Sequence, residues 1–254
     1  MIRMVAFDAD DTLWHTERLF LDTQRRFREL LARHTDPASI EQQLYDTEMR
    51  NLAHYGYGVK SFTLSMVETA IDLSRGDVTG GEIRQILRLG REMLLAPVEL
   101  IDGVREVVEA VAETRPLMLL PKGDLLDQET KLARSGIGDL FSVIEIVSRK
   151  DRTTYEGVIE RHGLEPHEFA MIGDSLRSDV LPVASMGGHA IHVPASTTWA
   201  HEEVSRERMD HVSFHTAATI RDVPDLLASP LSDSGHDIPK PNAGPSGGEP
   251  APRL

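Results

Sequence analysis

Short apolar runs recur along the chain at residues 1–7, 117–120, 143–147, 169–172 and 190–193. Each run holds four to seven residues and is bounded by Asp, Gly, Pro or Ser, as is typical of strands buried on both faces of a parallel sheet. Segments with apolar residues at helical spacing lie between the later runs. This alternation of strand and helix predicts an α/β fold built on a doubly wound parallel sheet.

One long segment, 16–96, breaks this alternation because it holds helical patterns and no strand-like run. The apolar positions indicate four helices, and Leu64, Val67 and Ile71 mark the apolar face of the third. Thr79 is suited to cap the fourth helix. A helical segment of this length between the first two strands predicts an inserted helical domain.

The remaining chain divides into a core and a tail. We expect residues 1–15 and 97–228 to form the α/β core domain. The segment 229–254 contains six prolines, four glycines and almost no apolar side chains, so we expect a disordered tail. The alternative for this tail is a polyproline ligand for a proline-reading domain.

Composition narrows the classes of function. The chain has 254 residues with 27 basic and 41 acidic side chains, and a net charge of −14 argues against binding to nucleic acid polymers or anionic membranes. It has no cysteine, which excludes disulfides, thiolate metal sites and cysteine nucleophiles. No run approaches the roughly 20 apolar residues of a membrane span, and acids interrupt the first run early. We therefore expect a cytoplasmic protein.

Two acidic motifs follow predicted strands. Asp8, Asp10 and Asp11 come after the first run, and Asp174 and Asp179 come after the run at 169–172. Carboxyl ends of neighbouring parallel strands meet at the ligand-binding edge of such a sheet. Carboxylates gathered there would suit a magnesium ion, although each motif alone could be a solvated acidic turn.

The motifs together resemble those of the haloacid dehalogenase superfamily of hydrolases, most of which are phosphatases. DxDxT stands at Asp8–Thr12, and GDxxxxD stands at Gly173–Asp179. The helical insertion between them occupies the place of the family's type-one cap. The resemblance covers residues 1 to about 228 and implies a Rossmann-like core with a helical cap.

The resemblance also implies roles for five side chains. Asp8 would be the nucleophile that forms an aspartyl-phosphate, and Asp10 the general acid and then base. Lys150 would neutralise the nucleophile and the bound phosphate. Mg²⁺ would be held by Asp8, the Asp10 backbone carbonyl, Asp174 and Asp179.

The family's second motif is not matched. The family has Ser or Thr after the second core strand, whereas this chain has Pro121, which offers neither a hydroxyl nor a backbone N–H. Losing one such donor costs about 3 kcal/mol in comparable oxyanion sites. We expect the backbone N–H groups of Lys122 and Gly123, or the Lys122 ammonium, to bind the phosphate instead. Thr12 and Trp14 are further candidate substrate-binding residues, although Thr12 is also suited to fixing the turn.

The sequence thus favours a magnesium-dependent phosphatase that acts on a small phosphorylated metabolite, as a monomer or homodimer. A phosphotransferase or mutase would use the same nucleophile. A catalytically impaired binding module would account for Pro121. A dehalogenase is disfavoured, because the family's dehalogenases lack an acid at the position of Asp10.

Overall fold

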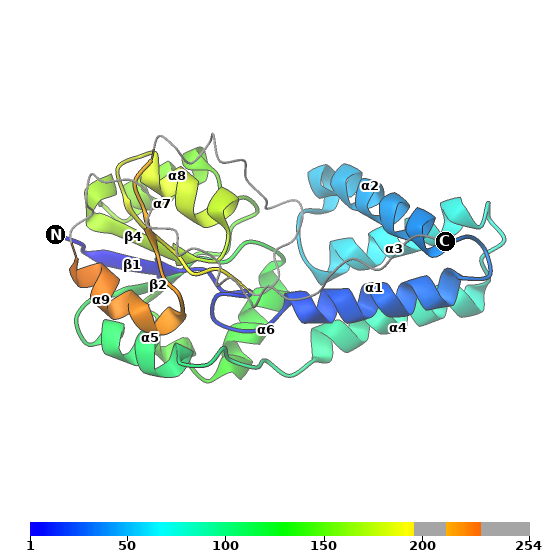
Figure 1. Ribbon diagram of the computed structural model, residues 1–254, viewed down its shortest axis with the longest axis horizontal. Helices are drawn as coiled ribbons and strands as arrows, with labels where there is room; N and C mark the ends of the chain where they lie inside the picture. Colours follow the sequence, from blue (N-terminus) through cyan, green and yellow to red (C-terminus); the bar gives the residue numbers. More distant parts are fainter. Residues whose placement is uncertain (196–211, 230–254) are drawn as a thin grey trace, which may run out of the picture.

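The computed structural model describes residues 1–195 and 212–229, which are coloured in Figure 1. Except for its first residue, the predicted disordered tail lies outside the described residues. Within the described residues, six parallel strands form one sheet in the order β3-β2-β1-β4-β5-β6. The predicted α/β fold with a parallel, Rossmann-like sheet is therefore confirmed.

The strands match the five predicted runs and add a sixth. They are β1 (Met4–Phe7), β2 (Leu117–Leu119), β3 (Val143–Ile144), β4 (Phe169–Gly173), β5 (His189–His192) and β6 (His215–Thr216). Three strands are shorter than predicted: β1 begins at Met4, β2 ends at Leu119, and β3 ends at Ile144. The sequence pattern missed β6 because it is a two-residue edge strand without an apolar residue.

The sheet is covered by helices on both faces. Helices α5 (Val104–Ala112), α6 (Leu125–Ser135) and α9 (Val223–Ala228) pack on one face, and α7 (Arg152–Arg161) and α8 (Leu181–Ala184) pack on the other. Short helical turns complete the described core: η1 (Gly138–Leu140), η2 (Pro166–Glu168), η3 (Leu176–Val180) and η6 (Ile220–Asp222). Every side chain of β1 is buried, as expected for the central strand of a two-sided sheet.

Four helices form a second unit beside the sheet. They are α1 (Glu17–Leu31), α2 (Pro37–Tyr55), α3 (Val59–Leu73) and α4 (Gly80–Leu95), and they extend away from the core in Figure 1. Their buried apolar side chains form a hydrophobic cluster separate from the two clusters of the sheet. Thr79 caps α4 as predicted, and it does so in a capping box with Glu82. We propose that this unit is the cap and keep the division into residues 16–96, 1–15 and 97–228 as a proposal.

The buried face of α3 differs from the predicted one. Leu64 and Ile71 are both 45% exposed, whereas Phe62 and Met66 are buried. The reason is that α3 packs between α2 and α4, where small polar side chains such as Ser65 allow close approach and hydrogen-bond to neighbouring helices. A pattern built on large apolar residues was therefore wrong for Leu64 and Ile71, whereas Val67 packs against the hydrophobic cluster of the helical unit. No helix among the described residues is long and apolar enough to cross a bilayer.

This packing predicts unequal losses of stability for two substitutions in the same helix. Met66→Ala should lower the free energy of unfolding by about 2–5 kcal/mol, because it leaves a cavity in the helical unit. Leu64→Ala should lower it by less than about 1 kcal/mol, because Leu64 lies on the exposed face. Chemical denaturation measures both values, and equal losses would contradict the assigned face.

Candidate active site

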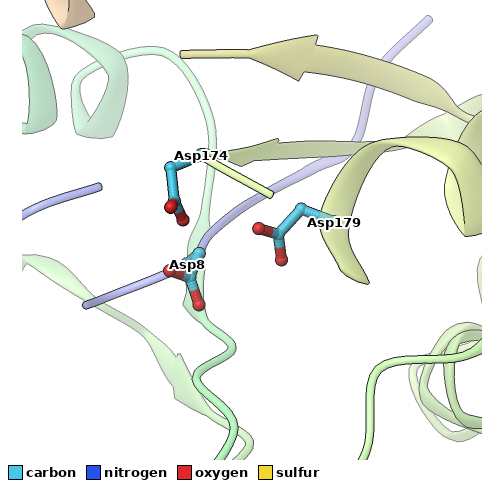
Figure 2. A group of neighbouring side chains, drawn as sticks. All are labelled: Asp8, Asp174 and Asp179. Atoms are coloured by element: carbon cyan, nitrogen blue, oxygen red, sulfur yellow. The ribbon is translucent and has the colours of Figure 1, made fainter. Parts of the chain in front are cut away.

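Three carboxylates meet at the carboxyl end of the central strands. Asp8 follows β1, Asp174 follows β4, and Asp179 lies in the π-helical turn η3. The backbone N–H of Asp8 donates to the carbonyl of Ile172 at 2.8 Å, which locks the two strand ends together. Figure 2 shows the three side chains facing a common point, and one oxygen from each lies within 4.8 Å of the others.

Gly173 is what allows Asp179 to approach this cluster. A Cβ atom on Gly173 would lie only 2.3 Å from the Asp179 carboxyl carbon, so a larger residue would displace that side chain. The Asp179 carboxylate also accepts a hydrogen bond from the backbone N–H of Ser175 at 3.1 Å. The main contribution of Gly173 is therefore the space that its missing side chain leaves for the Asp179 carboxylate.

Lys150 is the cation at the centre of the cluster. Its side chain is 1% exposed, and its Nζ forms ion pairs with Asp8 and, at 2.6 Å, with Asp179. Burial alone would lower the pKa of Lys150, but attraction by Asp179 and Asp8 outweighs it and raises the pKa above its ordinary value. Lys150 therefore keeps its charge beside both carboxylates.

One lysine does not balance the buried Asp8 and Asp179 together with the partly buried Asp174. Burial raises the pKa of Asp8 to about 7, with Asp179 adding repulsion and Lys150 opposing the change. Burial and the charges of Asp8 and Asp179 also raise the pKa of Asp174 well above its usual value. Carboxylates that are buried and repel one another favour either bound protons or a bound cation. The all-oxygen donor set of Asp8, Asp174 and Asp179 fits a hard divalent metal ion.

Asp10 lies in a different environment, surrounded by donors. Its Oδ1 accepts hydrogen bonds from Trp14 Nε1 at 2.8 Å, Thr16 Oγ1 at 2.7 Å and Lys131 Nζ at 2.9 Å. Its Oδ2 accepts one from Gln128 Nε2 at 2.7 Å. Burial by itself would raise the pKa of Asp10, but these partners lower it to about 2. In this conformation Asp10 is a carboxylate, the form suited to a base.

Helix α6 turns a polar face toward this carboxylate. Asp127, Gln128 and Lys131 lie on its inner side, and Leu125 and Leu126 are 58% and 63% exposed. None of these three inner residues was predicted, because the pattern of large apolar residues marks a different side of the helix. The available signal was their helical spacing just after an Asp124 cap.

Thr12 and Trp14 lie behind the carboxylates rather than along the cavity beside them. Both are buried, and neither is among the described residues that line that cavity. The Thr12 hydroxyl accepts a hydrogen bond from the Asp174 backbone N–H at 2.9 Å, and Trp14 donates to Asp10. These hydrogen bonds hold the two acidic loops in place, and direct contact of Thr12 and Trp14 with substrate stays a prediction.

The segment after β2 holds the residues predicted to bind phosphate. The Gly123 N–H donates to the Val147 carbonyl at 3.1 Å, so this donor already has a partner, and its contact with phosphate stays a prediction. Pro121 is buried and accepts a hydrogen bond from the Val147 N–H through its carbonyl. Lys122 does line the cavity, where its Nζ lies 3.0 Å from Ser178 Oγ and 4.6 Å above the ring of Tyr57.

The cavity lies between the core and the four-helix unit and has a volume of about 170 Å³. The core lines it with twelve described residues: Asp8, Asp10, Asp11, Lys122, Asp127, Gln128, Lys131, Lys150, Asp174, Ser175, Ser178 and Asp179. The helices add residues that sequence reasoning did not select: Glu17, Phe20, Gln24, Glu48, Leu52 and Phe62. No local motif marks these positions, because only the packing of α1, α2 and α3 against the core brings them to the site.

Comparisons with known proteins agree with this arrangement. Residues 2–187 match the family described as haloacid dehalogenase-like hydrolase. A haloacid dehalogenase-like family hydrolase from Xanthomonas campestris is 38% identical and has a TM-score of 0.80, with 89% of this chain and 91% of that chain covered.

Two further relatives differ in their named activities. Glyceraldehyde 3-phosphate phosphatase from Pyrococcus abyssi is 25% identical over 194 residues, which cover 74% of this chain and 79% of that protein. A 2-haloacid dehalogenase from Pseudomonas syringae, with a TM-score of 0.58 and 18% identity over 90% of this chain and 99% of that one, shares the fold. The family match spans well over half of the sequence, and this chain therefore belongs to the haloacid dehalogenase-like hydrolases.

Proposed function

We propose that this chain is a magnesium-dependent phosphatase that hydrolyses small phosphate monoesters through an aspartyl-phosphate on Asp8. The observation that carries the proposal is the ion pairing of Asp8 and Asp179 with the buried Lys150 at the carboxyl edge of the sheet. The similarity to a protein named as a phosphatase supports a phosphoester rather than a halide substrate. The cavity volume of about 170 Å³ favours a small molecule over a polymer, in agreement with the net charge.

In the proposed first step, an Asp8 carboxylate oxygen bonds to phosphorus as the ester P–O bond breaks. Lys150 stabilises the charge shared by the nucleophile and the phosphoryl oxygens. Water then attacks the aspartyl-phosphate, which releases inorganic phosphate and restores Asp8. Two easier displacements thus replace a single hydrolysis step that has a higher barrier.

Asp10 would move the protons in both steps. It gives a proton to the leaving alkoxide and later accepts one from the attacking water. The first role requires its ion pair with Lys131 to loosen when substrate binds, because that pair favours the charged form. Trp14 and Thr16 would keep the carboxylate in place during this change.

Mg²⁺ would be held by Asp8, Asp174, Asp179 and the backbone carbonyl of Asp10. When bound, it supplies positive charge that offsets the repulsion between a carboxylate nucleophile and a phosphate anion. The oxygen donors and the shortage of cations in this cluster support this choice of ion.

Asp8→Asn should abolish release of inorganic phosphate from a panel of phosphate monoesters, because an amide cannot act as the nucleophile. We expect a loss of at least about a thousandfold in kcat. Asp139→Asn, on the exposed turn η1, is the matched control and should leave the rate unchanged. Measuring free phosphate also separates hydrolysis from transfer to another alcohol. Activity that survives Asp8→Asn would contradict the mechanism.

Removal of divalent metal with a chelator should stop hydrolysis, and added Mg²⁺ should restore it. Asp174→Asn should raise the Mg²⁺ concentration needed for half-maximal rate, because it removes one proposed carboxylate ligand. Titration of phosphate release against Mg²⁺ measures both effects. A full rate in the presence of excess chelator would rule out the proposed metal requirement.

Pro121→Thr tests the alternative of a catalytically impaired module. The substitution restores the hydroxyl donor of the family's second motif, so we expect kcat to rise by about tenfold over a measurable wild-type rate. Pro121→Ala controls for the change in backbone freedom. Hydrolysis by the variant with none by the wild type would support the impaired module instead.

A further inference from the structure

Two acids line the end of the cavity formed by the helical unit. Glu17 begins α1 and Glu48 lies in α2, and both side chains are partly buried in the wall of the cavity that also contains Asp8. Neither carboxyl group has a hydrogen-bond or ion-pair partner among the described residues. Their position places them beside the alcohol part of an ester whose phosphate lies at Asp8.

Within residues 1–195 and 212–229, no cation pairs with these two carboxyl groups. Burial, with repulsion from Glu17, raises the pKa of Glu48 to about 8. Burial and the charge of Asp11 raise the pKa of Glu17 to about 7. By contrast, the cavity-lining lysine Lys131 pairs with Asp10 and Asp127. A positively charged group placed near the two glutamates would stabilise their carboxylates.

An independent observation points to a ligand with hydrogen-bond donors. Gln128 is 2% exposed and lines the same cavity, and its Oε1 has no hydrogen-bond partner among the described residues. Exchanging the positions of Oε1 and Nε2 would remove a hydrogen bond, because Nε2 donates to the Asp10 carboxylate, which can only accept. A buried acceptor without a donor is costly, so a donor group on a ligand would relieve it.

The overall charge of the cavity also favours a cationic ligand. Among the described residues, eight carboxyl side chains and three lysines line it. A phosphate monoester adds close to two negative charges at neutral pH, which the proposed divalent ion does no more than offset. The surplus of acids therefore remains for another part of the substrate to balance.

The cavity walls near the glutamates are aromatic and apolar. The rings of Phe20 and Phe62, both lining residues, have centroids 5.0 Å apart. Aromatic faces attract cations, and an apolar wall strengthens charge pairing by excluding water. A cation on a short carbon chain matches both the walls and the acids.

We propose that the substrate's alcohol part carries an ammonium group, bound by Glu17 and Glu48, so that the substrates are aminoalkyl phosphate monoesters. This inference rests on the proposed function for the position of the phosphate. The ammonium group has three N–H donors, and the unpartnered groups Glu17, Glu48 and Gln128 Oε1 all accept hydrogen bonds. Phe20 and Phe62 contact the carbon chain that joins the ammonium to the ester.

Binding of non-hydrolysable phosphonates tests the inference without requiring turnover. With Mg²⁺ present, calorimetry should give a Kd for 3-aminopropylphosphonate at least about tenfold lower than for butylphosphonate or 3-hydroxypropylphosphonate. These three probes have the same length and differ in the terminal group. Affinities within about twofold of one another would overturn the inference.

Variants identify the residues responsible. Glu17→Gln with Glu48→Gln should reduce the preference for the amino compound to about twofold or less, because both carboxylates are lost. Asp46→Asn, an exposed position on the same helix α2, removes a charge outside the cavity and should keep the preference. A preference that persists in the double variant would overturn the inference.

Rates of ester hydrolysis distinguish failure of the ammonium inference from failure of the proposed phosphatase function. Equal rates with butyl phosphate and 3-aminopropyl phosphate would overturn the ammonium inference and leave the phosphatase proposal standing. No hydrolysis of either ester would contradict the phosphatase proposal for these substrates, and the phosphonate affinities would still decide the ammonium inference.

Discussion

The crowding of buried carboxylates around Lys150 is the constraint on which the site depends. Asp8, Asp174 and Asp179 come from three places in the chain and would repel one another without compensating charge. Lys150 joins two of them, and strand pairing between β1 and β4 brings the first two together. Gly173 then leaves room for the third. The same arrangement that crowds the carboxylates suits them to bind a metal ion and places Asp8, the proposed nucleophile, beside a fixed cation.

Around this cluster, neighbouring acids lie in different electrostatic environments. Asp8 has a raised pKa because it is buried among other acids, whereas Asp10 has a lowered pKa because donors surround it. Lys131 and Gln128 from α6 create much of that difference. Two carboxylates only one residue apart can therefore take the separate roles of nucleophile and proton carrier.

The core of the site could be predicted from sequence because strand ends are local features. An apolar run followed by Asp8 or Asp174 places each carboxylate at the carboxyl end of a strand. Parallel pairing of β1 and β4 then brings both to the same edge of the sheet. The buried faces of helices were harder to predict, since α6 turns its polar side toward the site and leaves Leu125 exposed. The position of Glu48 in the cavity could not be predicted from the sequence, because it depends on how α2 packs against distant segments.

The central claim is that Asp8 forms a covalent bond to phosphorus. The most direct measurement is mass spectrometry of the wild-type protein, quenched in acid during turnover with Mg²⁺ and then digested. The account predicts one added phosphoryl group on the peptide that contains Asp8, and none on that peptide in Asp8→Asn. A phosphoryl group on another residue, or turnover with no phosphorylated peptide at any quench time, would contradict it.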